Sequence, residues 1–236
     1  FSGQLLLTHT LDNTDMPRRL KGFNLYYHMY SGEKQAALTA VKTFLARARA
    51  SQIAPIATSH YAAIADSFFA TEIEQVGLSA WSIQKQSHLS TLRFDASDAM
   101  NIDYDNSVGV IGSNTHAGSL YVAIDTAIPR VVIALKQREA DAAAGVRDVP
   151  ISLVHGRWQV SRMVREPCDV RVQSEGFGAG DMAWRGRANQ GYKIIAERAG
   201  RLLSEQVVWA DQAGQFVFTV AADAIEPLNV RIRCHD

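Results

Sequence analysis

The sequence lacks a net charge, a long apolar run and all but two cysteines. Among its 236 residues, 24 are Lys or Arg and 24 are Asp or Glu. Without an excess of positive charge, no field extends over the chain to hold a nucleic-acid backbone or an anionic membrane surface. No apolar run approaches the roughly 20 residues of a membrane-spanning helix, so we expect no transmembrane segment. Hydrophobic residues make up 47% of the chain, which excludes a disordered protein and indicates a globular one.

Local motifs for common catalytic chemistry are missing too. No histidines stand at the spacing H-x-x-x-H or H-E-x-x-H, and C-x-x-C does not occur, so no complete zinc site can be read from local motifs. The hydrolase pattern G-x-S-x-G is also absent. Gly176–Gly180 (GFGAG) superficially matches a dinucleotide-binding loop, but loop-like and strand-like residues follow it rather than a helix. We therefore expect a connection between strands there.

The chain begins at Phe1, without Met and without a signal segment, so we expect it to be a piece of something longer. Its two cysteines, Cys168 and Cys234, both lie in strand-like contexts. One disulfide would suit a periplasmic or secreted setting. Two free buried thiols are an equally good interpretation at this point.

The first 75 residues alternate between strand-like and helix-like segments. Strands are expected at Gln4–Thr8, Phe23–Tyr30 and Ile53–Thr58, where short apolar or aromatic runs occur. Helices are expected at Glu33–Ala50 and His60–Ala70, where apolar residues recur three and four positions apart. This order is typical of an α/β layer.

After Thr71 the pattern changes to short β-rich runs separated by Asp, Asn, Gly and Ser. Such a series predicts an antiparallel β-sandwich. Arg138–Gly145 is the clearest interruption, so the region contains one sandwich or two. The expected strands are Val76–Lys85, Leu89–Asp95, Ser107–Ile111, Ser119–Ile124, Arg130–Leu135, Ile151–Val154, Trp158–Val164, Val170–Gln173, Gly191–Glu197, Gln206–Ala210, Gln215–Val220 and Asn229–Cys234.

Four tryptophans, Trp81, Trp158, Trp184 and Trp209, are spread through the β-rich part. An exposed tryptophan can stack on the C–H face of a sugar ring, whereas a buried one belongs to the core. Trp184 stands among charged residues in a glycine-rich stretch. We therefore expect Trp184 to be the exposed, sugar-binding member of the four.

His28 stands in an aromatic run next to Tyr26, Tyr27 and Tyr30, just before a Ser-Gly turn. In α/β barrels the carboxyl ends of strands carry the catalytic groups. A histidine at such an end suits general acid–base catalysis near neutral pH. A packed, hydrogen-bonded histidine is the alternative.

Residues 17–34 (PRRLKGFNLYYHMYSGEK) carry a resemblance to a known family. The stretch resembles the closing strand and helix of NodB-like polysaccharide deacetylases, in particular the large multidomain deacetylases of biofilm exopolysaccharide systems such as Pel. Residues 55–61 (PIATSHY) resemble the final strand-to-helix passage of the same barrels. The resemblance implies that residues 1–75 are the last βα units of a NodB-like (β/α) barrel. Residues 76–236 would be an accessory β-sandwich region that binds carbohydrate.

By this resemblance, His28 matches the general acid that protonates the leaving group when an N-acetyl group is removed. Leu25 would line the pocket, although its spacing Leu-x-x-His departs from the commoner Leu-x-His, and Tyr27 and Tyr30 would shape the sugar site. The resemblance also implies a divalent metal, which we expect to be zinc. Its ligands, the aspartate and paired histidines of the family's earlier motifs, are not in this chain.

Eight βα units take about 250 residues, so about 75 residues supply only two or three of them. We therefore expect this chain to be inactive alone, and to work with the rest of the barrel or with an associated chain. The expected substrate is an N-acetylated exopolysaccharide, and the expected location is periplasmic or secreted. The alternative is a non-catalytic β-sandwich module that binds a glycan or a partner protein.

Overall fold

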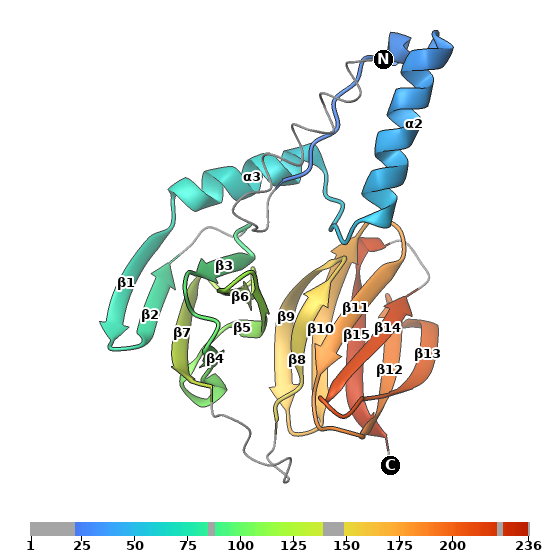
Figure 1. Ribbon diagram of the computed structural model, residues 1–236. Coiled ribbons are helices and arrows are strands. Elements are labelled where there is room, and N and C mark those ends of the chain that lie inside the picture. Colours follow the sequence, from blue (N-terminus) through green and yellow to red (C-terminus); the bar gives the residue numbers. More distant parts are fainter. Residues whose placement is uncertain (1–21, 85–87, 139–148, 221–223, 236) are drawn as a thin grey trace. The chain divides into compact units, whose positions relative to one another are not determined.

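A computed structural model describes residues 22–84, 88–138, 149–220 and 224–235 (Figure 1). The chain divides into two compact units, Phe1–Ile53 and Ala54–Asp236. The strand expected at Gln4–Thr8 lies outside the described residues.

In the first unit, residues 22–28 are outside helices and strands and lead into a short 3₁₀ helix, η1 (Met29–Gly32). Helix α2 (Gln35–Ala50) follows and confirms the helix expected at Glu33–Ala50. Its only buried residue is Phe44, and Arg47 and Arg49 in the last turn complement the negative end of the helix dipole. Among the described residues, no helix is both long and apolar enough to cross a membrane.

The expected barrel units are wrong. Neither Phe23–Tyr30 nor Ile53–Thr58 forms a strand, and in the described part of the chain the first strand begins only at Glu72. Thr58 already belongs to helix α3 (Thr58–Phe69), which confirms the helix expected at His60–Ala70. Aromatic and β-branched residues favour strands because they pack on neighbouring strands. Without a strand paired to it, an aromatic run of this kind gains nothing from the β conformation.

The second unit is mostly β and contains three sheets (Figure 1). The four-stranded sheet has the order β1-β2-β7-β4, the six-stranded sheet β14-β11-β8-β5-β6-β3, and the five-stranded sheet β13-β12-β15-β10-β9. The strands of the first half are β1 (Glu72–Gly77), β2 (Ala80–Gln84), β3 (Thr91–Phe94), β4 (Met100–Ile102), β5 (Val110–His116), β6 (Ser119–Ile124) and β7 (Arg130–Gln137), with η2 (Tyr104–Asn106) between β4 and β5.

The first half forms a sandwich between the four-stranded sheet and strands β3, β5 and β6 of the six-stranded sheet. Alternate residues of β6 and β7 lie in this core, as the two-residue period of a strand requires. Ile83 on β2 and Ile133 on β7 meet Val122 and Ile124 on β6 in this core.

The second half contains β8 (Ser152–Gly156), β9 (Gln159–Glu166), β10 (Asp169–Gly176), β11 (Gly180–Arg185), β12 (Gly191–Arg198), β13 (Arg201–Trp209), β14 (Gln215–Val220) and β15 (Ala224–His235). Its core lies between the five-stranded sheet and strands β14, β11 and β8. Tyr192 stacks on Phe216 with ring centroids 4.2 Å apart. Burial raises the pKa of the Tyr192 phenol, whose oxygen accepts a hydrogen bond from the Arg187 backbone N–H at 2.7 Å. Residues 76–236 therefore contain two sandwich cores.

The two sandwiches are joined through the six-stranded sheet, where β5 and β8 run parallel and Gly112 pairs with Leu153. A Cβ atom at residue 112 would lie 2.0 Å from the Leu153 carbonyl oxygen, so only glycine fits. The half-buried Arg165 on β9 reinforces the join by donating hydrogen bonds to the carbonyls of Val110, Ile111 and Ile151. Burial lowers the pKa of the Arg165 guanidinium.

A disulfide links Cys168, in the turn between β9 and β10, to Cys234 on β15. The two residues are 66 positions apart, and the Cys234 N–H also donates to the Cys168 carbonyl at 2.9 Å. Of the two earlier interpretations, the disulfide is the one found. It is compatible with an oxidising, extracellular compartment.

Candidate functional site

His28 lies exposed in the extended segment of the first unit. Its ring stacks on Tyr30, with centroids 4.8 Å apart and an angle of 9° between the planes. Tyr26 meets the same imidazole edge-on at 5.1 Å. Within the described residues, the His28 side chain makes no hydrogen bond, so both ring nitrogens can reach a ligand.

Tyr26 and His28 point to the same side because residues two apart do so in an extended backbone. Tyr30 reaches the His28 ring from η1. The sequence places Tyr26 near His28, but the resemblance does not assign it to the site. Tyr27 is 46% exposed but makes no ring contact with His28 in the described part of the chain. Leu25 is half-buried. The odd-even spacing of the aromatic run was the signal that could have found Tyr26.

The described residues do not fit the metal that the resemblance implies. Among them, no group of three or more His, Cys, Asp or Glu side chains is close enough to hold an ion.

Trp184 is fully buried in the second sandwich, so its expected role in sugar binding is wrong. On β11, Met182 and Trp184 face the core, while Asp181 and Arg185 face solvent. The charged residues Asp181 and Arg185 stand three and one positions from Trp184, which places them on the opposite face of the strand. The alternation of faces along a strand therefore predicts that Trp184 is buried.

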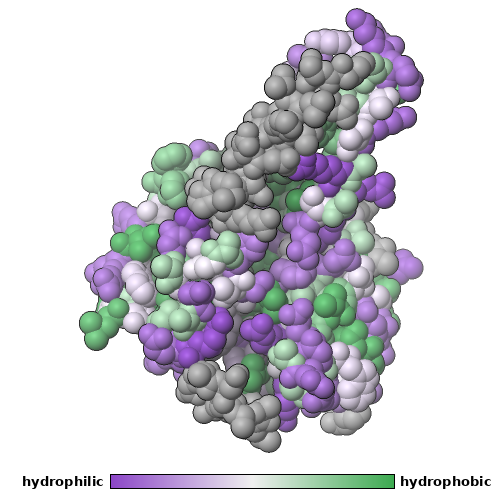
Figure 2. Space-filling model, in the orientation of Figure 1, coloured by the Kyte–Doolittle hydropathy of each residue, from purple (hydrophilic) through white to green (hydrophobic). Residues whose placement is uncertain are grey.

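Trp209, at the end of edge strand β13, is the exposed tryptophan of the four, at 66%. Trp158 is buried, and Trp81 packs on Phe94 with ring centroids 5.1 Å apart. Figure 2 shows hydrophobic residues gathered over β13 and β14. Leu202, Leu203 and Val207 on β13 and Val217 on β14 are exposed.

The GFGAG segment connects β10 to β11, which confirms the expected connection between strands. Its end glycines are there because Trp158 packs against them. A Cβ atom at Gly176 would lie 2.3 Å from Trp158 Cδ1, and one at Gly180 would lie 2.6 Å from Trp158 Cδ2. The Trp158 indole N–H donates to the Gly178 carbonyl at 3.1 Å, which fixes the turn.

A pocket of about 200 Å³ in the second unit lies beside this turn. It is formed where the segment before α3 meets the ends of β9 and β10. Its polar side chains are His60, Arg157, Gln159 and Glu175. Its apolar side chains are Pro55, Ile56, Ala57, Phe177 and Ile225.

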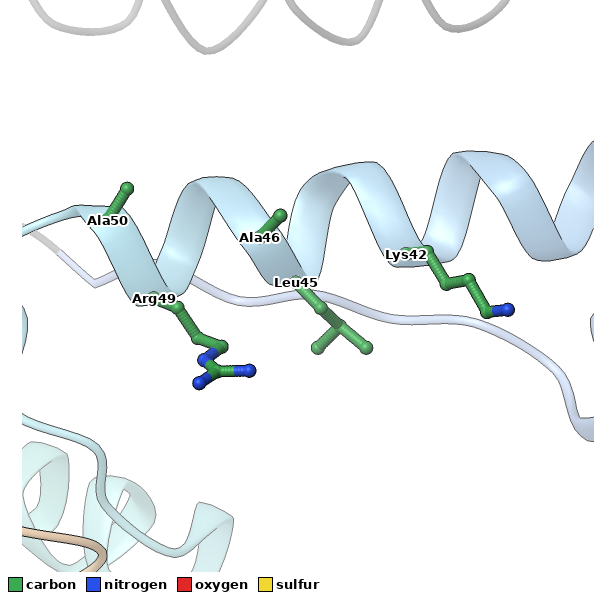
Figure 3. A pocket seen from close by; sticks show the side chains of 5 residues that line it. All are labelled: Lys42, Leu45, Ala46, Arg49 and Ala50. Atoms are coloured by element: carbon green, nitrogen blue, oxygen red, sulfur yellow. The ribbon is translucent and has the colours of Figure 1, made fainter.

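A second hollow, of about 480 Å³, lies along α2 in the first unit (Figure 3). Lys42, Leu45 and Arg49 project to the same side of the helix, as their spacing of three and four residues requires. All the described residues around this hollow come from that one helix. Because a single helix does not enclose a ligand, this hollow is a weaker candidate than the pocket beside the turn.

Comparison with known protein families, with curated proteins and with solved structures finds no match.

Proposed function

We propose that this chain is part of a polysaccharide deacetylase that removes N-acetyl groups from an exopolysaccharide, with His28 as the general acid. The observation that supports this most directly is the exposed His28 imidazole held between Tyr26 and Tyr30. Aromatic faces suit the C–H face of a sugar ring, and the imidazole is free to transfer a proton.

The chemistry assigned to His28 is the departure of the sugar nitrogen. Water adds to the acetyl carbon, and the C–N bond then breaks. The nitrogen leaves as an amine only if it gains a proton, because the amide anion is a very poor leaving group. Protonated His28 donates this proton, and neutral imidazole remains. Imidazole suits this role because it exchanges protons near neutral pH.

The remaining catalytic groups, including the ligands of the implied divalent metal, come in this proposal from residues outside this chain. Exposed aromatic side chains on α3 of the second unit support an association with further protein. Phe68 is 64% exposed and Phe69 84%, and their rings are in contact with centroids 5.3 Å apart. Large apolar side chains gathered on a surface commonly mark an interaction site. The disulfide is consistent with a periplasmic or secreted location.

The test uses the complete protein that contains this chain. His28→Ala should lower acetate release from an N-acetylated polysaccharide by roughly 10²–10⁴ fold, the usual contribution of a general acid. His116→Ala is the matched control, because His116 is an exposed histidine on β5. Full activity of the His28 variant would contradict the assignment.

A non-catalytic β-sandwich module that binds glycan is the second candidate, and exposed Trp209 favours it. The chain of 236 residues should then be retarded in an affinity gel that contains polysaccharide, and Trp209→Ala should weaken the retardation. A chain that moves identically with and without polymer would remove this candidate. The two functions are compatible, since a catalytic region and a sugar-binding region often share a chain.

A further inference from the structure

We propose that the pocket between the segment before α3 and the β10–β11 turn binds one pyranose residue of the polysaccharide. This inference rests on the proposed function, which makes a glycan the ligand. It adds a binding site separate from His28, because every pocket residue belongs to the second unit.

The pocket contains polar side chains that the described protein leaves without partners. Among the described residues, Nε2 of His60 is buried and has no hydrogen-bond partner, and the His60 ring meets that of His88 edge-on, with centroids 5.5 Å apart. The side chains of Arg157 and Glu175 form no ion pair or hydrogen bond with any described residue. Buried polar atoms normally have partners, so the unpaired Nε2 of His60 at this pocket indicates a ligand. Arg157 and Glu175 are half-buried, so a ligand there replaces water around their charged groups.

The charges of these side chains select the class of ligand. Arg157 is a cationic donor and Glu175 an anionic acceptor, so an anion would be repelled by one and a cation by the other. Sugar hydroxyl groups both donate and accept hydrogen bonds without carrying charge. A neutral, polyhydroxylated ring therefore satisfies both side chains at once.

Gln159 offers a further acceptor in a fixed position. Its Nε2 donates to the Thr126 hydroxyl at 3.1 Å, and no residue in the described part of the chain donates to its Oε1. The turn that carries Phe177 is held by the hydrogen bond from Trp158 to Gly178. A site that is formed before the ligand arrives loses less entropy on binding.

The apolar wall and the size of the pocket match a single sugar ring. Phe177 and Ile225 are exposed and can cover the C–H face of a pyranose, or the methyl group of an acetamide. The volume of about 200 Å³ lies below the roughly 300–1,000 Å³ of pockets that enclose drug-sized ligands. One ring of a polymer fits, and the chain of sugars continues into solvent.

The test titrates the isotope-labelled 236-residue chain with N-acetylglucosamine and N-acetylgalactosamine oligosaccharides and follows backbone and side-chain NMR shifts. We expect saturable shifts at His60, Gly176, Phe177 and Ile225. Arg157→Ala and Glu175→Gln should each weaken binding about tenfold or more, because each removes hydrogen bonds to a charged group. Arg185→Ala is the matched control, since Arg185 is exposed on β11 and lies outside the pocket.

Two results would overturn the pocket. One is the absence of saturable shifts at these residues with both oligosaccharides. The other is an equal response to inorganic phosphate or ethylammonium, which would make the pocket a charge site. The two proposals are tested by different readouts: the pocket by the NMR shifts of its own residues, and the deacetylase by acetate release from the complete protein. If no oligosaccharide binds in the pocket but His28→Ala abolishes acetate release, the pocket proposal is wrong and the deacetylase proposal is supported.

Discussion

At the scale of single residues, an ion pair between Asp169 and Arg231 links β10 to β15 near the disulfide. The Arg231 Nε donates to both carboxylate oxygens, at 3.1 and 2.9 Å, and its Nη2 donates to Oδ2. These hydrogen bonds, reinforced by the charges of Arg231 and Arg171, hold the pKa of Asp169 below its usual value. The folded protein therefore favours the ionised carboxylate more than the unfolded chain does.

This lowered pKa predicts a loss of stability in acid. The contribution of Asp169 is complete above the unfolded pKa of an aspartate, about 3.9, and is lost as the pH falls toward the lower folded pKa. Urea unfolding measured from pH 7 down to pH 3 should show a shallower acid decline for Asp169→Asn than for the unchanged chain. If the unfolding free energy falls equally with pH for the two proteins, the pair of Asp169 and Arg231 contributes nothing to stability.

Single residues also show where sequence reasoning succeeds and fails. His28 is exposed among tyrosines, and these contacts are local, because its neighbours in sequence are also its neighbours in space. Its role as general acid stays a prediction. The expected exposure of Trp184 is wrong because adjacent residues of a strand face opposite ways, so charged neighbours in sequence do not share its environment. The pocket could not be foreseen, since His60, Arg157 and Glu175 meet only through the fold.

At the scale of elements, helices were predictable and isolated strands were not. The apolar spacing that predicted α2 and α3 is a property of each segment alone. A strand needs a partner, so Phe23–Tyr30 looked strand-like by composition but is not one in this chain. The β-rich region was predictable because its many strands supply partners for one another. Its division into two cores was left open and needed the structure.

The β10–β11 connection gives a prediction about an element. Gly176→Ala and Gly180→Ala should each cost about 1–3 kcal/mol of unfolding free energy, because the new methyl group collides with Trp158 in a packed core. Gly178→Ala is the control: nothing lies within 4 Å of its Cβ position, and only its positive φ of 69° opposes the change. Denaturant unfolding of the three variants measures this. An equal or larger loss of stability for Gly178→Ala would mean that backbone conformation, and not contact with Trp158, requires glycine in this connection.

At the scale of the whole molecule, several connections hold the two sandwiches together. Besides Arg165, the buried Asp125 at the end of the first sandwich accepts hydrogen bonds from the backbone N–H groups of Arg162 and Met163 on β9, at 2.9 and 2.8 Å. A buried carboxylate with such partners is costly to replace. The second unit is therefore built as a continuous body through its shared sheet.

The disulfide should stabilise the second unit by raising the free energy of its unfolded state. Closing a loop across 66 residues lowers the conformational entropy of the unfolded chain, which raises its free energy by up to about 4 kcal/mol in the chain-entropy treatment. The double variant Cys168→Ser/Cys234→Ser should therefore unfold at a lower denaturant concentration, and reductant should shift the unchanged chain the same way. Reductant should not affect the double variant further. Unfolding midpoints that do not move would show that the bond adds nothing to folding.

The central claim is that His28 gives a proton to a departing amine, and leaving-group chemistry tests this most directly. The complete protein should be measured on an N-acetylated oligosaccharide and on an activated aryl acetate, whose phenolate leaves without a proton. His28→Ala should lose roughly 10²–10⁴ fold of its rate on the amide and keep most of its rate on the ester. Equal losses on both substrates, or no loss on the amide, would contradict a role for His28 as the general acid.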